Sequence, residues 1–577
     1  MTSQDLLLRA RAWLDDDSDP EDRAELSRLI DLTSNDPSAL AELSERFSGP
    51  LEFGTAGLRG LIGAGESRMC SAVVRRTTWG LCQHLLATVP DARARGIVLG
   101  RDGRRRSDEF LRQAAGVAIA LGIRVHLYPG PIPTPLVSFA VRSLEAAAGV
   151  AVTASHNPPE YNGYKVFREG GAQIVPPEDA AIATLIARAP KARDLEVLPI
   201  EGSSLVHDAT PVEATYLETL AHHPALHRDQ VVRPLRIAYT ALHGVGERLA
   251  RAALAREGHE VFSVAEQAEP DGRFPTVRFP NPEEPGAMDM LLEVARASNA
   301  DLAIANDPDA DRLAVAVPNG RGGLQVLTGD EVGVLLGEHA LRKSGPGVVI
   351  STVVSSTQLG RIARAMGSTH AETLTGFKWI AARGRALEAE GSRFVFGYEE
   401  ALGYAIGGIT WDKDGISAAV AFASLAAELL EKKLGVLDHL AELRRIHGFH
   451  CSKQKNVVLP GASGQKAREA AMVRLRERPP RSLGGLQVRV AWDLLSRTRR
   501  RGDSIEGATE LPASNVVIFD LEGGARAAVR PSGTEPKIKL YLEVVEDLGV
   551  GRERAESRAA ERLEGLARDL SASAGLS

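Results

Sequence analysis

Cysteine is scarce in this chain of 577 residues, which contains only Cys70, Cys82 and Cys451. Three cysteines cannot form a complete set of disulfides, and their spacing lacks the close pairs that are typical of a zinc site. Such sparse use of cysteine is typical of a reducing compartment. We therefore expect a cytoplasmic protein.

Long apolar runs are also missing. The least polar stretch, residues 416–430, still contains Ser417, Ser424 and Glu428, and its pattern favours a buried helix over a membrane span. The segment MTSQDLLLRARAWLDDD has no apolar core of signal-peptide length and continues into acidic residues. We therefore expect an intracellular protein that has no membrane partner.

A strong excess of one charge is absent as well. The formal net charge is −6, and charged residues make up 25% of the chain. Because the arginines are spread along the chain, this balance argues against a nucleic-acid partner. Apolar residues contribute 44%, as in ordinary globular proteins. The chain is too long for a single hydrophobic core, so we expect about three to five domains.

One pattern of strand, helix, glycine and strand occurs three times, over residues 96–127, 235–264 and 348–374. Short β-branched strands that alternate with helices predict βαβ units and largely parallel sheets. The wide separation of the copies favours three similar α/β domains over a solenoid of short repeats. Chance recurrence of the pattern within a large α/β protein is the alternative.

The two ends of the chain differ from these repeats. Near the C-terminus the sequence predicts an α+β domain with an antiparallel sheet. Its expected strands are residues 487–492, 515–521, 527–530 and 538–545, followed by an amphipathic helix at 552–570. The N-terminal segment predicts helices at 6–14 and 20–32, packed outside the first sheet.

The loop Thr-Ala-Ser-His-Asn-Pro-Pro presents Ser155 beside His156 directly after an apolar strand at 146–152. Ligands in α/β proteins bind at such strand ends, so Ser155 is a candidate nucleophile. A lone Ser-His pair is more often an ordinary surface loop. The argument for a site therefore depends on the motifs found elsewhere in the chain.

Asp307, Asp309 and Asp311 are spaced at i, i+2 and i+4, and an extended backbone would point their carboxylates to one side. Clustered carboxylates need a cation, and oxygen ligands suit Mg²⁺ or Ca²⁺. An EF-hand is excluded because Arg312 and Pro318 occupy the positions of its glycine and its last glutamate. We expect a Mg²⁺ site; an Asp-rich turn that caps a helix is the alternative.

Arg-Pro-Ser-Gly-Thr at residues 530–534 offers a guanidinium, two hydroxyls and backbone N–H groups that can surround a phosphate. It does not match the phosphate loop of nucleotide triphosphatases, and alone it would be a plain turn. A nucleophile, a hard-metal site and an anion cradle together indicate phosphoryl transfer.

Two further loops are polar without an evident structural reason. Gly-Thr-Ala-Gly-Leu-Arg-Gly at 54–60 contains Arg59, and Gly-Tyr-Glu-Glu-Ala-Leu-Gly at 397–403 contains Glu399 and Glu400 at the end of a strand. Adjacent carboxylates suit hydrogen bonds to sugar hydroxyls, although a solvated acidic turn is the alternative. Lys165 and Lys378 are ambiguous on their own.

Taken in order, the motifs GTAGLRG, TASHNPPEYNGYK, DPDADR, GYEEALG and RPSGTEPKIK resemble those of the α-D-phosphohexomutase superfamily, the phosphoglucomutase and phosphomannomutase enzymes. The resemblance runs from Gly54 to Tyr541. GTAGLRG, TGFKWI and GYEEALG look most similar to the phosphoglucomutase-2 branch, which includes phosphopentomutase-like members.

The resemblance implies four domains around one central cleft, and we place their boundaries at residues 1–225, 226–343, 344–452 and 453–577. It also implies a role for each motif. Ser155 would be the phosphoserine, and Asp307, Asp309 and Asp311 would bind Mg²⁺ together with it. The other implied groups are the flanking residues Arg59, His156, Lys165 and Lys378, the sugar-binding residues Glu399, Glu400 and Arg312, and the phosphate-binding residues Arg530, Ser532, Gly533 and Thr534.

The implied reaction interconverts glucose 1-phosphate and glucose 6-phosphate, with glucose 1,6-bisphosphate or an equivalent sugar bisphosphate as activator and a monomer or dimer as the working form. Ala401 replaces a serine that many relatives have in the sugar loop, so mannose or pentose phosphates remain alternative substrates. A serine-dependent metallophosphatase and a non-catalytic sugar-phosphate-binding protein are the rival functions.

Overall fold

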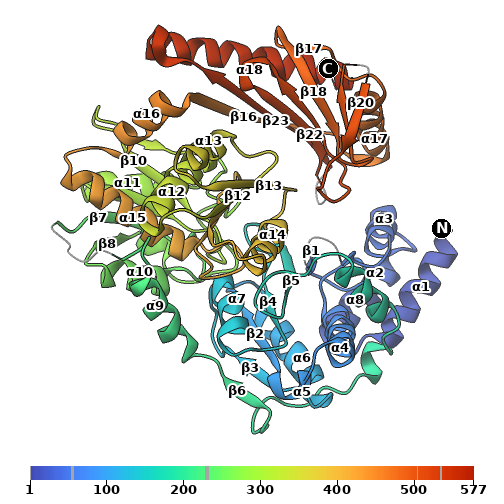
Figure 1. The fold of residues 1–577 in the computed structure, drawn as a ribbon. Coiled ribbons are helices and arrows are strands. Elements are labelled where there is room, and N and C mark those ends of the chain that lie inside the picture. Colours follow the sequence, from blue (N-terminus) through green and yellow to red (C-terminus); the bar gives the residue numbers. More distant parts are fainter. Residues whose placement is uncertain (1, 54–56, 228–232, 503, 533–535, 577) are drawn as a thin grey trace.

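The computed structural model describes residues 2–53, 57–227, 233–502, 504–532 and 536–576. Within these ranges the strands form four sheets, and helices cover them (Figure 1). The first three sheets mix parallel with antiparallel strands, and the fourth is antiparallel. The expected fold class, three α/β units followed by an α+β unit, is therefore confirmed.

The first three sheets share one arrangement, which the sequence repeat explains. In each, a buried strand leads into a helix, and the chain returns as a parallel neighbour after a glycine with positive φ. Glycine suits this position because left-handed backbone costs it little. The units are β2 (Ile97–Arg101), α6 (Ser107–Ala120) and β3 (Val125–Leu127); β7 (Arg236–Thr240), α10 (Glu247–Arg256) and β8 (Glu260–Ser263); and β12 (Val348–Thr352), α13 (Gln358–Ala365) and β13 (Thr369–Thr373).

Further strands extend each of these sheets. The strand orders are β1-β5-β4-β2-β3-β6, β11-β10-β9-β7-β8 and β13-β12-β14-β15. The added strands are β1 (Gly57–Leu61), β4 (Ala148–Val152), β5 (Tyr161–Arg168), β6 (Val206–Asp208), β9 (Leu302–Ala305), β10 (Ala314–Pro318), β11 (Leu324–Val326), β14 (Phe394–Glu399) and β15 (Gly403–Ile406).

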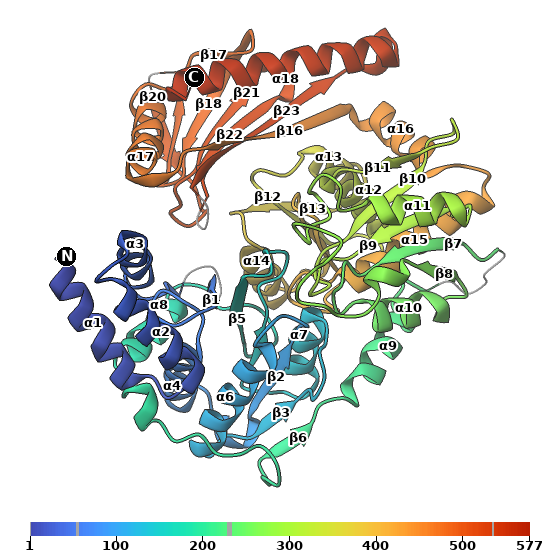
Figure 2. The ribbon, with the colours of Figure 1, turned by 180° about the vertical axis from the view of Figure 1, so that it is seen from behind.

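The fourth sheet belongs to the C-terminal part and has the order β16-β23-β22-β21-β18-β19-β20. Helices α17 and α18 lie together beside it (Figure 2). Its strands are β16 (Phe449–Val458), β17 (Ser482–Leu483), β18 (Leu486–Asp493), β19 (Thr498–Arg501), β20 (Ser504–Ala508), β21 (Val517–Leu521), β22 (Arg526–Pro531) and β23 (Lys537–Glu546), and its helices are α17 (Gly461–Glu477) and α18 (Arg552–Ala574).

The helices follow the apolar pattern of the sequence. The least polar stretch forms α15 (Gly415–Glu431), which is buried along nearly its whole length, as expected. In the part of the chain that the structure describes, no helix is long and apolar enough to cross a membrane. The remaining helices are α1 (Ser3–Asp16), α2 (Pro20–Leu32), α3 (Pro37–Arg46), α4 (Ser71–Thr88), α5 (Ala92–Arg95), α7 (Thr134–Ser143), α8 (Glu178–Ala187), α9 (Val212–His222), α11 (Asp289–Ala297), α12 (Gly329–Ser344), α14 (Phe377–Ala389), α15 (Gly415–Glu431) and α16 (Val436–His447).

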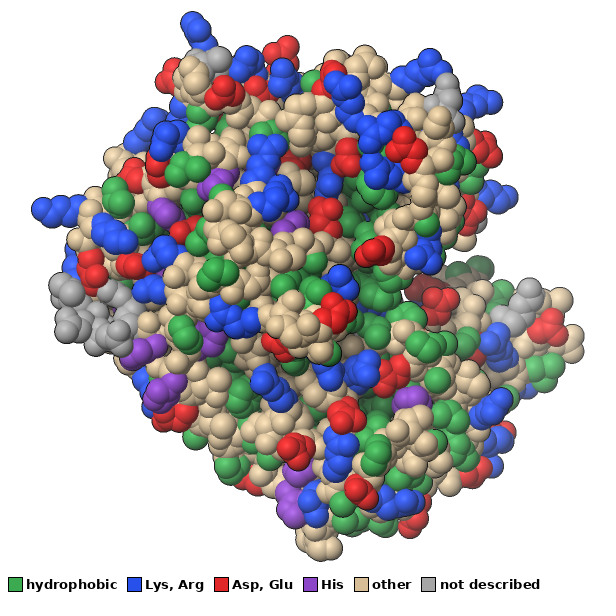
Figure 3. All heavy atoms as spheres, viewed as in Figure 1, with side chains coloured by type: hydrophobic (Ala, Val, Ile, Leu, Met, Phe, Trp, Pro, Cys, Tyr) green, Lys and Arg blue, Asp and Glu red, His purple; other side chains and the backbone are tan. Residues whose placement is uncertain are grey.

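Packing joins the first three units more tightly than the fourth. One continuous apolar cluster runs from Val98 in the first sheet to Leu443 in α16 and includes side chains of all three α/β units. The fourth sheet has its own core and contacts the third unit through a small cluster that includes Leu374 and Tyr541. Figure 3 shows the surface hollowed between the C-terminal unit at the top and the N-terminal helices.

Candidate active site

Ser155 lies in a short loop that follows β4. Thr153 fixes this loop, because its hydroxyl accepts a 2.8 Å hydrogen bond from the Ser155 N–H and donates one of 2.6 Å to Asp102 Oδ2. The φ of Ser155 is 53°, a left-handed value that non-glycine residues adopt at a cost. The loop is thus held in a strained conformation that presents a nearly buried serine hydroxyl.

Asp307, Asp309 and Asp311 follow β9, and their carboxylates are fully buried. Here the sequence expectation was wrong in one respect, since the backbone makes a turn and is not extended. The Ala310 N–H donates to Asp307 O at 2.8 Å, and Ala310 has a φ of 55°. The turn gathers three carboxylate oxygens within 4.8 Å of one another.

Ser155, from the first α/β unit, lies within hydrogen-bond distance of Asp307, from the second unit. Ser155 Oγ donates a 2.8 Å hydrogen bond to Asp307 Oδ2, and it lies 3.2 Å from His156 Nδ1. Burial and the guanidinium groups of Arg312 and Arg59 hold the pKa of His156 well below its usual value. The imidazole is therefore neutral at pH 7.

Two lysines contact the aspartates. Lys165 Nζ lies 2.8 Å from Asp309 Oδ2 and 2.7 Å from Asp311 Oδ2, and Lys413 Nζ lies 3.2 Å from Asp311. Burial works against ionisation, but the two ammonium groups lower the pKa of Asp311 below its usual range. Burial and the two neighbouring carboxylates raise the pKa of Asp307 well above its ordinary value.

Two carboxylate oxygens of the cluster remain available to a cation. Asp309 Oδ1 and Asp311 Oδ1 are buried and have no hydrogen-bond partner among the described residues. A buried charged oxygen without a partner is costly, and hard divalent cations prefer such ligands. The donor set therefore fits Mg²⁺.

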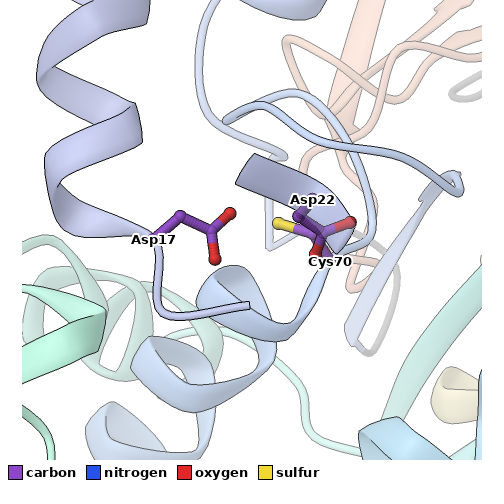
Figure 4. A group of neighbouring side chains, drawn as sticks. All are labelled: Asp17, Asp22 and Cys70. Carbon is purple, nitrogen blue, oxygen red and sulfur yellow. The ribbon is translucent and has the colours of Figure 1, made fainter. Parts of the chain in front are cut away.

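A second group of metal-ligand side chains, Asp17, Asp22 and Cys70, lies between the N-terminal helices and α4 (Figure 4). Within this group Arg106 pairs with Asp22, because its guanidinium donates to both carboxylate oxygens of Asp22 at 2.6 and 2.9 Å. Asp17 Oδ2 is buried without a hydrogen-bond partner among the described residues, and no serine hydroxyl corresponding to Ser155 is bonded to this group there.

A pocket opens in front of Ser155. Seven residues that the sequence singled out line it: Arg59, Ser155, Lys165, Asp311, Arg312, Lys378 and Glu399. Gln173, Thr375 and Lys413 line it too, and the sequence analysis missed them. The only local signal for Lys413 is its place in Trp-Asp-Lys-Asp-Gly, a charged segment directly before the buried helix α15.

The two glutamates of the acidic loop point to different neighbours. Glu399 Oε1 accepts a 2.8 Å hydrogen bond from the Gly376 N–H at the pocket wall. Glu400 instead accepts hydrogen bonds of 3.1 Å from the hydroxyls of Thr352, at the end of β12, and Ser355, in the loop that follows β12. Burial and the charge of Glu399 raise the pKa of Glu400 to about 7.

The expected phosphate cradle lies on the fourth sheet and faces the third unit. The Arg530 guanidinium donates to the hydroxyl of Thr375, which lines the pocket. The Ser532 N–H donates to Lys537 O at 2.9 Å. Gly533 and Thr534 lie outside the described residues. Arg530 thus connects the C-terminal unit to the pocket wall.

Comparison with known proteins agrees with this geometry. Domain models of phosphoglucomutase/phosphomannomutase match residues 50–193, 214–322 and 328–443 (α/β/α domains I to III) and 487–561 (C-terminal domain). A Haemophilus influenzae protein named a probable phosphomannomutase is 38% identical over 82% of this chain and 93% of its own length. The phosphopentomutase of Homo sapiens is 36% identical over 87% and 86%.

A solved structure shows the same fold. The phosphoglucomutase/phosphomannomutase family protein of Burkholderia thailandensis superposes with a TM-score of 0.66 at 22% identity, and the match covers 90% of this chain and 97% of that one. Matching domains in the same order, together with relatives that align over most of their length, show that this chain belongs to the phosphoglucomutase/phosphomannomutase family.

Proposed function

We propose that this chain interconverts glucose 1-phosphate and glucose 6-phosphate through a phosphoserine at Ser155 and a bisphosphorylated sugar. One observation supports this more than any other: the 2.8 Å hydrogen bond from Ser155 Oγ to Asp307. It brings a serine hydroxyl to a carboxylate cluster that suits Mg²⁺. That combination is suited to storing and transferring a phosphoryl group.

In the proposed cycle, phosphorylated Ser155 gives its phosphoryl group to the free hydroxyl of a sugar monophosphate. The bond from phosphorus to Ser155 Oγ breaks, a bond to the sugar oxygen forms, and the hydroxyl proton leaves. Neutral His156 beside Ser155 Oγ is suited to accept that proton. The bisphosphate then turns over, its other phosphorus–oxygen bond to the sugar breaks as the bond to Ser155 Oγ forms, and the released sugar oxygen takes up the proton.

The charges around Ser155 support the same cycle. A phosphoserine has a charge of about −1.5 to −2 at pH 7. Mg²⁺ bound by Asp307, Asp309 and Asp311 would offset this charge. Arg59, Lys165, Arg312 and Lys378 line the pocket and can stabilise the transferring group and the second phosphate together with Arg530, Ser532, Gly533 and Thr534.

Mannose and pentose phosphates are the second candidate substrates. Relatives named phosphomannomutase and phosphopentomutase favour them, as does Ala401, whose methyl group imposes no hydroxyl requirement. In our proposal Glu399, at the pocket wall, binds the sugar hydroxyls. We expect glucose 1-phosphate to be the best hexose substrate, with measurable turnover of mannose 1-phosphate or ribose 1-phosphate.

An assay of the purified protein with each sugar 1-phosphate, Mg²⁺ and a trace of glucose 1,6-bisphosphate tests the proposal. Mass spectrometry should place a mass increase of about 80 Da on Ser155 after incubation with the bisphosphate. Ser155→Ala should abolish turnover, whereas Ser424→Ala, at a buried serine of α15, should not. Release of inorganic phosphate without isomerisation would favour the phosphatase, and binding without turnover would favour the binding protein.

A further inference from the structure

Arg104 lies in the loop after β2 and has no place in the cycle described above. Its side chain is only 1% exposed, and it does not line the pocket. Its Nη2 donates to the carbonyl oxygens of Ser155 and Asn157 at 2.5 Å, and its Nη1 donates to Pro158 O at 2.8 Å. One guanidinium thus binds three carbonyl groups of the loop that presents Ser155.

The Pro158 carbonyl also accepts a 3.1 Å hydrogen bond from the Tyr161 N–H, whereas the carbonyl groups of Ser155 and Asn157 lie outside any strand and lack ladder partners. The planar guanidinium provides several donors in fixed directions, which an ammonium group cannot reproduce. Asp102, which also binds the Thr153 hydroxyl, lies 3.2 Å from the Arg104 Nε and completes the support of the loop.

Arg104 also contacts the second unit of the chain. Its Cζ lies 4.9 Å from the centre of the Phe274 ring, a cation–π arrangement. A Cβ at Gly272 would lie 2.7 Å from the Arg104 Cα, so the two backbones are in close contact. The segment 270–274 is therefore packed directly against the Arg104 loop.

The same segment leads to the aspartate turn. The Asp271 N–H donates to His243 O at 2.9 Å, and the Val245 N–H donates to Pro308 O at 2.9 Å. A Cβ at Gly244 would lie 2.3 Å from the Pro308 Cα. Contacts therefore run without a break from the Ser155 loop through Arg104 and residues 270–274 to the turn that holds Asp307 and Asp309.

We infer that Arg104 is a positioning residue that sets the distance between Ser155 and the aspartate turn. The inference rests on the proposed function for its catalytic readout. Phosphoryl transfer depends on the geometry of the reacting groups, and an error of about 1 Å costs about 100-fold in rate. Arg104→Lys keeps the charge but loses the planar donor set, so kcat should fall by about 10- to 100-fold. The KM for sugar phosphate should stay within about twofold, because Arg104 does not line the pocket.

Hydrogen–deuterium exchange provides a readout that needs no activity. At temperatures well below the Tm of the variant, Arg104→Lys should speed exchange in the peptides that contain Ser155, Phe274 and Asp307. Phe274→Leu keeps an apolar side chain, removes the cation–π contact and should change the same peptides more weakly. Arg112→Lys is the control, since Arg112 is half exposed on α6 and, within the described part of the chain, its ion pairs are with Asp108 and Glu201.

The outcomes separate the two proposals. Unchanged kcat and exchange in folded Arg104→Lys would overturn the positioning role. Faster exchange confined to the Ser155 peptide would overturn the coupling to the aspartate turn. If the wild-type protein shows no mutase turnover, the proposed function fails, and the exchange experiment still decides whether Arg104 couples the two loops.

Discussion

Lys165→Met removes the positive charge that two buried carboxylates share. The ammonium group lies 2.8 Å from Asp309 and 2.7 Å from Asp311, and its side chain is 11% exposed. Methionine has a similar unbranched shape, so the substitution changes charge far more than volume. Removing one partner of a buried ion pair costs about 3–5 kcal/mol, because the remaining charge is left uncompensated.

This cost should be visible in thermal unfolding. A unit of about 150–250 residues loses about 2–4 °C of Tm per kcal/mol, so Lys165→Met should lower the Tm by about 6–20 °C in EDTA. Mg²⁺ at about 100 times its Kd should raise the free energy of unfolding by about 2.7 kcal/mol. The Mg²⁺-induced rise in Tm should therefore be larger for the variant than for the wild-type protein, whose lysine competes with the cation.

Differential scanning fluorimetry in EDTA and in Mg²⁺ measures both effects. Lys432→Met is the matched control, because Lys432 is 57% exposed and its ion pair with Glu428 is a surface contact that contributes about 0–1 kcal/mol. An unchanged Tm in EDTA would show that Lys165 does not neutralise the carboxylates. If Lys165→Met lowered the Tm by the same amount with and without Mg²⁺, the cation site would be refuted.

Three further substitutions test other parts of the structure. Asp309→Asn should lower kcat by about 100-fold or more, the effect of losing an electrostatic stabiliser, and titration of activity with Mg²⁺ should show a weakened dependence. Glu399→Ala should reduce kcat/KM for every sugar while bisphosphate still labels Ser155 in mass spectrometry; unchanged kcat/KM would mean that the glutamate only caps the Gly376 N–H. Burial and the charge of Asp22 raise the pKa of Asp17 to about 6, so its ionised form destabilises the fold at higher pH. Asp17→Asn should therefore have no effect on the unfolding free energy below about pH 4 and should stabilise the protein by about 3 kcal/mol above pH 6, as measured by urea unfolding across this range.

The repeats could be predicted from the sequence because local signals and packing agree in them. The strands at 97–101, 236–240 and 348–352 are short, apolar and followed by a helix that ends before a glycine. Strand β16 was missed for the opposite reason. Its residues Ser452 to Asn456 are polar and mostly exposed, so its sequence lacks the apolar pattern of a strand, and pairing with β23 defines it.

In the acidic loop, strand geometry distinguishes two adjacent residues with the same side chain. Successive side chains along a strand point to opposite faces, and β14 ends at Glu399. Of Glu399 and Glu400, only Glu399 lines the pocket, while Glu400 binds hydroxyls of the third unit. The sequence identified the loop, and the alternation of a strand would have favoured one of its two carboxylates.

Arg104 and Lys413 could not be assigned from the sequence, because their partners lie far away along the chain. Arg104 binds carbonyl groups more than fifty positions away, and Lys413 contacts Asp311 from the third unit. A charged residue in a loop is normally solvated, and only the fold shows that these two are buried against a specific acceptor. Motifs identify residues with recognisable neighbours, whereas supporting residues become visible through tertiary contacts.

The charge of the pocket has the opposite sign to that of the whole chain. The net charge is −6, yet five cationic side chains and only two carboxylates line the pocket. Low-dielectric walls strengthen such a local excess, which attracts anions whatever the overall charge. The proposed bisphosphate has two phosphate groups of about −1.5 to −2 each, and such an excess favours it over either monophosphate. A mutase that must keep its intermediate bound while that intermediate turns over would need this difference, and the five cationic side chains supply a local positive excess within an otherwise acidic protein.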